Sequence, residues 1–151
     1  MRKTIGVSIL LLVLGTIIGN GLYNKLHTSF LEVFKENNSC YFIQEGIYSN
    51  YDLMFENTKD IDIKLIEKEN NKYYVYLGIS SNLDNANKLK DIYEKEGYKV
   101  RIKEVNLNNE EFYTNLVQFD LLIDKTSSDN EILTIEEVIL ANYEEIIRKG
   151  K

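Results

Sequence analysis

The sequence predicts an α+β domain with the element order βαββαβ, preceded by one transmembrane helix and followed by a C-terminal helical extension. The first observation is a repeat: residues 41–48 and 73–80 resemble each other at an offset of 32 residues, with tyrosine, glycine and isoleucine at the same places. Each copy is rich in β-branched and aromatic residues and is followed by Ser-Asn and a helical pattern, which indicates a strand, a turn and a helix. The second observation is that residues 4–22 carry no charge.

Residues 1–22 are predicted to form a membrane anchor, whose uncharged part is Thr4–Leu22. As a helix this part would span about 28 Å, close to the hydrocarbon thickness of a bilayer. Arg2 and Lys3 precede it, so the positive-inside rule places the N-terminus in the cytoplasm and the bulk of the chain outside the cell membrane. A cleaved signal peptide is the alternative, because residues 19–21 are small, but the apolar run exceeds the usual length of a signal sequence. A retained single-pass anchor is therefore favoured.

Residues 23–40 are predicted to form a juxtamembrane helical stalk. Leu26, Phe30 and Phe34 recur every four residues and give this segment an apolar stripe. The stripe would lie against lipid headgroups or against a second copy of the chain, so a homo-oligomer is one expected partner. Polar residues 36–39 end the helix before the first strand.

The first copy of the repeat is expected to form a strand at 41–48 and then a short helix. Alternation places Ile43 and Ile47 on one face of the strand. The other face would carry Phe42, Gln44, Gly46 and Tyr48. Ser49 is the expected N-cap of the helix, which would turn three apolar residues inward: Leu53, Met54 and Phe55.

A second strand is expected at Ile61–Glu67, with alternating apolar residues on its core face, followed by a polar turn of hairpin length at 69–72. The second copy of the repeat gives a strand at 73–79, which would bury Val75, Leu77 and Ile79. Asn82 is the expected cap of the next helix, and Gly97 its C-terminal left-handed residue. The apolar stripe of this helix is Ala86, Leu89, Ile92 and Tyr93. The fourth strand is expected at Lys99–Val105, with Arg101 and Lys103 outward.

This order of elements is that of a ferredoxin-like fold, in which two helices cover one face of a four-stranded sheet. The other face is open in such a fold and is a usual position for a ligand. The residues expected on it are Phe42, Gln44, Tyr48, Tyr74, Tyr76 and Arg101.

Residues 41–49 resemble the opening strand of the SPOR (sporulation-related) domain, an aromatic-Val-Gln-apolar-Gly-apolar-aromatic-Ser pattern. Residues 73–80 are similar to the third strand of that family, and residues 85–98 to its second helix, so the resemblance covers 41–105. It implies a domain that binds peptidoglycan, notably glycan strands stripped of their stem peptides, in cell division or sporulation. Such domains commonly follow one N-terminal membrane helix.

The resemblance also implies where the glycan binds. Family contacts lie on the open sheet face, where Gln44 matches the glutamine of the family's first strand. The expected platform is Gln44, Tyr48, Tyr74, Tyr76 and Arg101. Two residues depart from the family pattern. Glu45 replaces a buried apolar residue, so either the register slips there or Glu45 is paired, with Lys64 as the suggested partner. Ser80 replaces an apolar or aromatic residue at the end of the third strand.

The composition argues against several other functions. The 151 residues carry a net charge of −6, which disfavours nucleic acid as a partner. His27 and Cys40 are the only histidine and cysteine, so neither a Cys/His zinc site nor a nucleophile-His-Asp triad can form. We therefore expect no metal, no cofactor and no enzymatic activity. Cys40 is expected at the entry to the first strand as a structural residue.

Residues 106–151 are the C-terminal helical extension, with amphipathic helices expected at 110–123 and 131–148. They could pack on the free edge of the domain, bind a partner, or cover the platform itself. The acidic pairs Glu136-Glu137 and Glu144-Glu145 are expected on solvated faces. The alternative function is a protein-interaction scaffold in an envelope complex, without glycan binding.

Overall fold

The structure is a computed structural model, and it describes residues 38–149. The chain divides into two units, 1–37 and 38–151, of which only the second is described below. The predicted anchor and nearly all of the predicted stalk therefore lie outside the described residues. Within residues 38–149, no helix has both the length and the apolar character needed to cross a membrane.

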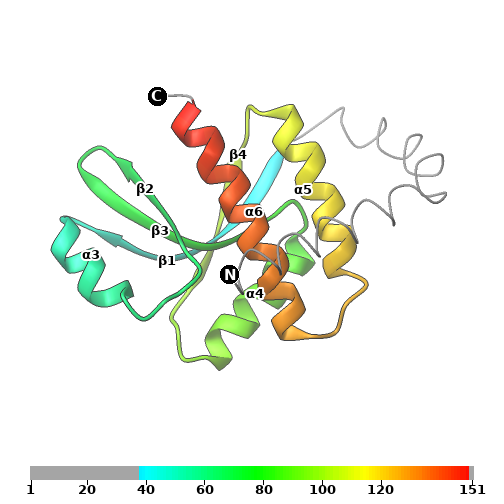
Figure 1. The fold of residues 1–151 in the computed structure, drawn as a ribbon, viewed down its shortest axis with the longest axis horizontal. Helices are drawn as coiled ribbons and strands as arrows, with labels where there is room; N and C mark the ends of the chain where they lie inside the picture. The colour runs from blue at the N-terminus through cyan, green and yellow to red at the C-terminus, as the bar shows by residue number, and fades with distance from the viewer. Residues whose placement is uncertain (1–37, 150–151) are drawn as a thin grey trace, which may run out of the picture. The chain divides into compact units, whose positions relative to one another are not determined.

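The described part is an α+β domain, as predicted, with a four-stranded antiparallel sheet and helices around it (Figure 1). The first six elements follow the order βαββαβ and two further helices complete the domain. In chain order the elements are β1 (Ser39–Tyr48), α3 (Tyr51–Thr58), β2 (Leu65–Glu69), β3 (Lys72–Ser80), α4 (Leu83–Lys95), β4 (Arg101–Asn106), α5 (Glu110–Ile123) and α6 (Asp129–Lys149).

The strands lie in the order β2-β3-β1-β4, so the two copies of the repeat, β1 and β3, are neighbours at the centre of the sheet. The short strand β2 pairs with β3 only from Lys72 to Tyr76. Beyond Tyr76, the outer edge of β3 therefore has no strand beside it in the described chain.

The register between β1 and β3 is irregular around Glu45. Ile43 lies opposite Gly78, Gln44 opposite Tyr76, and Gly46 opposite Val75, which leaves Glu45 and Leu77 out of the pairing. Of the two alternatives for Glu45, the slip in register is confirmed. The alternation beyond it is consequently shifted, and the prediction that Ile47 shares a face with Ile43 is wrong: Ile43 is buried, whereas the Ile47 side chain is 42% exposed.

Glu45 also has a partner, but not the suggested one. Both carboxylate oxygens of Glu45 accept from the Tyr48 hydroxyl, at 2.9 and 2.8 Å. Lys64 instead donates to the backbone carbonyls of Thr58 and Ile61, at 2.6 and 2.8 Å. The Tyr48 ring lies so close over Gly46 that a Cβ there would be 2.7 Å from Cε2 of the ring.

Three details of the first βα unit differ from the prediction. Asn50, rather than Ser49, caps α3, because its side chain accepts from the backbone N–H of Leu53. Met54 is buried, whereas Leu53 and Phe55 are about half exposed. The second strand begins at Leu65, not Ile61, since the preceding residues form a loop that Lys64 holds.

The second βα unit follows the prediction closely. Asn70 and Asn71 both have positive φ in the turn between β2 and β3. Asn82 caps α4, Gly97 has a φ of +93° after its end, and the predicted stripe is buried. A Cβ placed on Gly78 would lie 3.3 Å from Leu89, which brings α4 close against the central strands.

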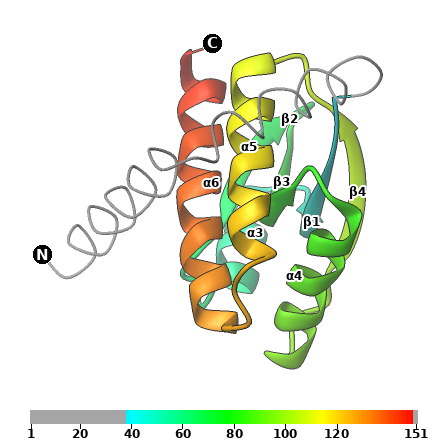
Figure 2. The same cartoon turned by 90° about the vertical axis from the view of Figure 1, so that its right-hand side faces the viewer.

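The two C-terminal helices lie side by side (Figure 2), and α6 packs on β3 and β2. Gly78 and its partner Ile43 face Leu89 of α4, and a Cβ on Gly78 would also lie 3.0 Å from Oε2 of Glu136 in α6. Phe42 precedes Ile43 and so points to the opposite face. There its ring meets that of Tyr143 in α6, with centroids 5.3 Å apart. The core therefore has two parts, one under α4 and one under α6.

Candidate functional site

The predicted platform lies on the face of the sheet that α6 partly covers. Phe42 and Tyr76 are each only 2% exposed and Gln44 is 1% exposed. The rings of Phe42 and Tyr76 meet edge to face with centroids 5.0 Å apart, and Tyr143 packs on the same Phe42 ring. The C-terminal extension therefore covers this part of the platform.

Next to this covered part, the same face stays accessible around Tyr74. The Tyr74 ring is partly exposed and stacks on Tyr76, with centroids 6.5 Å apart and planes 11° from parallel. Lys103 places its Nζ 5.3 Å from the Tyr74 ring centroid and donates to the Tyr76 hydroxyl at 3.3 Å. Burial raises the pKa of Tyr76 to about 12, which keeps this hydroxyl neutral.

Arg101 completes the accessible part. It is exposed at the start of β4, opposite Gln44 in the neighbouring strand, and its Nη2 donates to Gln44 Oε1 at 3.2 Å. The structure thus brings together four of the five predicted residues: Gln44, Tyr74, Tyr76 and Arg101. Lys103 joins them as a residue the prediction omitted. Its signal was its place two residues from Arg101 on the same strand, which puts both side chains on one face.

Tyr48 does not join this group. It pairs with Tyr73, whose ring contacts Tyr51 of α3, so the shifted alternation turns Tyr48 toward the opposite face. Its hydroxyl is held by Glu45. Burial, and then the hydrogen bond to this carboxylate, raise the pKa of Tyr48.

Residues 69–118 match the model of the SPOR domain family, from the end of β2 through β3, α4 and β4 into α5. This part of the chain, about a third of its length, is therefore similar to the SPOR domain family. The predicted resemblance to this family is confirmed for residues 69–105, which include Tyr74, Tyr76, Arg101 and Lys103; the first strand with Gln44 lies outside the matched residues. SPOR domains are non-catalytic domains of cell division proteins and bind peptidoglycan. No curated protein and no solved structure matches the chain.

A second polar cluster lies where β3 has no neighbouring strand beyond Tyr76. Asp120 of α5 accepts from the hydroxyls of Ser80 and Ser81, at 2.5 and 2.6 Å, and from the Ser81 backbone N–H at 2.7 Å. It also accepts from Asn85 at 3.1 Å. Burial raises the pKa of Asp120, and these hydrogen bonds oppose that shift. Ser80, which replaces an apolar or aromatic residue of the family pattern, therefore has a hydrogen-bond partner in the C-terminal extension, Asp120.

Glu136 of α6 is the second carboxyl at this edge. It is fully buried, so the prediction that it lies on a solvated face is wrong. Its Oε2 accepts from the backbone N–H of Ile79 at 2.9 Å, while its Oε1 has no hydrogen-bond partner within the described residues. Burial raises the pKa of Glu136 well above its usual value. Sequence reasoning missed this role because an acidic pair in a helix usually faces water.

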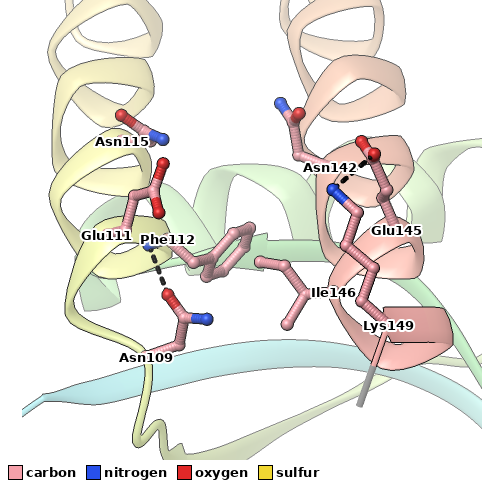
Figure 3. A pocket seen from close by; sticks show the side chains of 8 residues that line it. All are labelled: Asn109, Glu111, Phe112, Asn115, Asn142, Glu145, Ile146 and Lys149. Carbon is pink, nitrogen blue, oxygen red and sulfur yellow. Dashed lines mark hydrogen bonds and ion pairs between the residues drawn. The ribbon is translucent and has the colours of Figure 1, made fainter. Parts of the chain in front are cut away.

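A hollow of about 450 Å³ lies between the start of α5 and the end of α6 (Figure 3). In this view Phe112 of α5 and Ile146 of α6 point toward each other, and asparagines and glutamates surround them. Lys149, the lysine of this hollow, pairs with Glu145 at 2.8 Å. The lining residues are Asn109, Glu111, Phe112, Asn115, Asn142, Glu145, Ile146 and Lys149, none of which belongs to the predicted platform.

Proposed function

We propose that the SPOR-like domain of this chain binds peptidoglycan glycan strands that have lost their stem peptides, in cell division or sporulation. The observation that carries this proposal is the partly exposed Tyr74 ring, which has Lys103 over it, with the exposed Arg101 on the same accessible part of the sheet face. Sugar rings stack their C–H faces on aromatic side chains, and sugar hydroxyls accept hydrogen bonds from cationic donors. The accessible part offers both kinds of contact.

The two buried residues of the platform act beneath this surface rather than on it. Tyr76 supports the Tyr74 ring from one side and accepts a hydrogen bond from Lys103. Gln44 accepts from Arg101 and donates through Nε2 to the backbone carbonyl of Gly46 at 3.3 Å. We therefore assign sugar contact to Tyr74, Arg101 and Lys103, and positioning to Tyr76 and Gln44.

The same proposal places the domain outside the cytoplasmic membrane, held by residues 4–22. The support is the uncharged run and the two cations before it. The test fuses, after Lys151, a reporter enzyme that is active only outside the cytoplasm. This reporter should be active. An inactive reporter would contradict this placement.

The binding test uses the full chain in detergent and insoluble sacculi from which an amidase has removed the stem peptides. The wild-type chain should sediment with these sacculi, and Tyr74→Ala should remove most of the binding. Tyr51→Ala is the matched control, because Tyr51 is an exposed tyrosine in α3, outside the proposed site. The proposal fails if the wild-type chain stays in the supernatant, or if both variants bind equally.

A further inference from the structure

The negative charge of the chain is concentrated in its C-terminal helices. Residues 107–149 contain ten acidic and three basic residues, whereas residues 38–106 contain twelve acidic and ten basic residues. Two of the ten acidic residues, Asp120 and Glu136, are buried at the edge of β3. The other eight are at least partly exposed, so the pair of helices α5 and α6 presents a strongly acidic surface.

The hollow between the start of α5 and the end of α6 opens on this acidic surface (Figure 3). Its volume of about 450 Å³ is that of an ordinary ligand pocket, for which the range is about 300–1,000 Å³. Its apolar base consists of Phe112, which is buried, and Ile146, which is half-buried. The Phe112 ring contacts that of Tyr143, with centroids 5.1 Å apart, and Tyr143 contacts Phe42 of the sheet. The core therefore holds this base in place.

The polar side chains around the base are exposed and largely free to bind a ligand. Within residues 38–149, the side chains of Asn115 and Asn142 make no hydrogen bond, and Glu111 has no cation within 4.0 Å. Glu145 and Lys149 neutralise each other, since they pair at 2.8 Å. Among the described residues that line the hollow, the charge left without a partner is thus the negative charge of Glu111.

These groups match the chemistry of a basic peptide. The side-chain amide of asparagine has N–H donors and a carbonyl acceptor, as the peptide backbone does, so the two can bond to each other. The apolar base suits an apolar side chain. The Glu111 carboxylate and the acidic surface attract lysine or arginine. The same charges repel an anionic lipid surface, and they repel the acidic helices of a second copy.

We propose that the hollow between α5 and α6 binds a basic segment of a partner protein. An apolar side chain of that segment lies between Phe112 and Ile146, a lysine or arginine lies beside Glu111, and Asn115 and Asn142 bond to its backbone. The hollow shares no residue with the predicted platform. The inference is therefore independent of glycan binding.

The test first varies the ligand, so it does not depend on any variant folding. The probe is an array of short synthetic peptides in which one leucine, isoleucine or phenylalanine is flanked by lysine and arginine, by glutamate, or by serine. The full chain in detergent should bind the basic set most tightly, and added salt should weaken this binding. Replacement of the apolar residue by alanine should weaken the binding of the basic set by about tenfold.

Two variants then assign the binding to the hollow. Glu111→Lys reverses the charge beside the apolar base and should weaken the binding of the basic set by about tenfold or more. Glu144→Lys is the matched control, because Glu144 is an exposed residue of α6 that does not line the hollow, and the net charge of the chain changes equally. It should weaken binding by about twofold or less. Circular dichroism checks that both variants are folded.

Three results would overturn the inference. The first is an array on which the basic set is not preferred, or on which alanine replaces the apolar residue without effect. The second is an equal loss of binding in Glu111→Lys and Glu144→Lys, which would mean that the acidic surface attracts cations diffusely. The third is a change of oligomeric state in Glu111→Lys, measured by light scattering in detergent, which would identify a second copy of the chain as the occupant.

Discussion

The covered and accessible halves of one sheet face contain similar residues and differ in what lies over them. Phe42 and Tyr76 are buried under Tyr143 of α6, while Tyr74 remains partly exposed. Tyr74 and Tyr76 alternate along the same strand and even stack on each other. The difference shows that an aromatic residue on this face is part of the core where α6 covers it and is accessible to solvent where α6 does not.

The largest expected effect concerns the covered half. Phe42→Ala should lower the free energy of unfolding by about 3–5 kcal/mol, because it empties a site packed by Tyr76 and Tyr143. Leu89→Ala, in the core under α4, should cost about 2–5 kcal/mol. Leu53→Ala is the control, since half-exposed Leu53 should cost less than about 1 kcal/mol. Equal effects of Phe42→Ala and Leu53→Ala in urea unfolding would mean that α6 does not cover this face.

A smaller effect is expected at the edge of β3. Asp120→Ala should lower the free energy of unfolding by about 1–3 kcal/mol, because buried donors from Ser80, Ser81 and Asn85 lose their acceptor. Asp120→Asn keeps one acceptor oxygen and should retain part of the stability. Thermal unfolding of both variants measures the difference. Wild-type stability in Asp120→Ala would contradict the role given to this cluster.

The pH dependence of stability should report Glu136. Its folded pKa lies above the usual 4.5, so its stabilising contribution is present below about pH 4.5 and is lost as the pH rises through the folded pKa. The groups facing it are the Ile79 N–H from β3, Asp120 from α5 and Tyr93 from α4. Relative to the wild-type chain, Glu136→Gln should therefore gain stability as the pH increases from about 5 to about 8. A difference that stays constant over this range would show that folding does not raise the pKa of Glu136.

The smallest effect on stability is expected in the accessible half. Tyr74→Ala should change the free energy of unfolding by about 1 kcal/mol or less, although it removes most of the glycan binding. Tyr76→Ala should have the larger effect on stability: it should lower the free energy of unfolding by several kcal/mol, because the Tyr76 ring is buried. If Tyr74→Ala lowered the free energy of unfolding as much as Tyr76→Ala, the two halves of the sheet face would not differ as described.

Local signals predicted the second βα unit well. The cap at Asn82, the left-handed Gly97 and the stripe around Leu89 depend on neighbours in the sequence, and the structure contains all three. The first unit was harder, because the register slip at Glu45 depends on pairing with a distant strand. That slip turned Tyr48 and Ile47 to faces that simple alternation does not give.

The sequence predicted the kinds of residue on this face of the sheet, but not how much of the face is accessible. Aromatic and cationic residues on alternate positions of β3 and β4 predicted which side chains share one face of the sheet. How much of it is covered depends on where α6 crosses the sheet, and a helical pattern at 131–148 does not contain that information. The burial of Glu136 was missed for a related reason, since it requires an unpaired strand edge that only the assembled sheet provides.

The hydrogen bond from Ile79 to Glu136 also bears on self-association. A strand edge with free backbone groups recruits strands from other molecules, which leads to aggregation. At the end of β3 the positions that an added strand would use are already occupied: Glu136 holds the N–H of Ile79, and Asp120 holds that of Ser81. Two carboxyl groups from the extension thus protect this edge from intermolecular β-pairing.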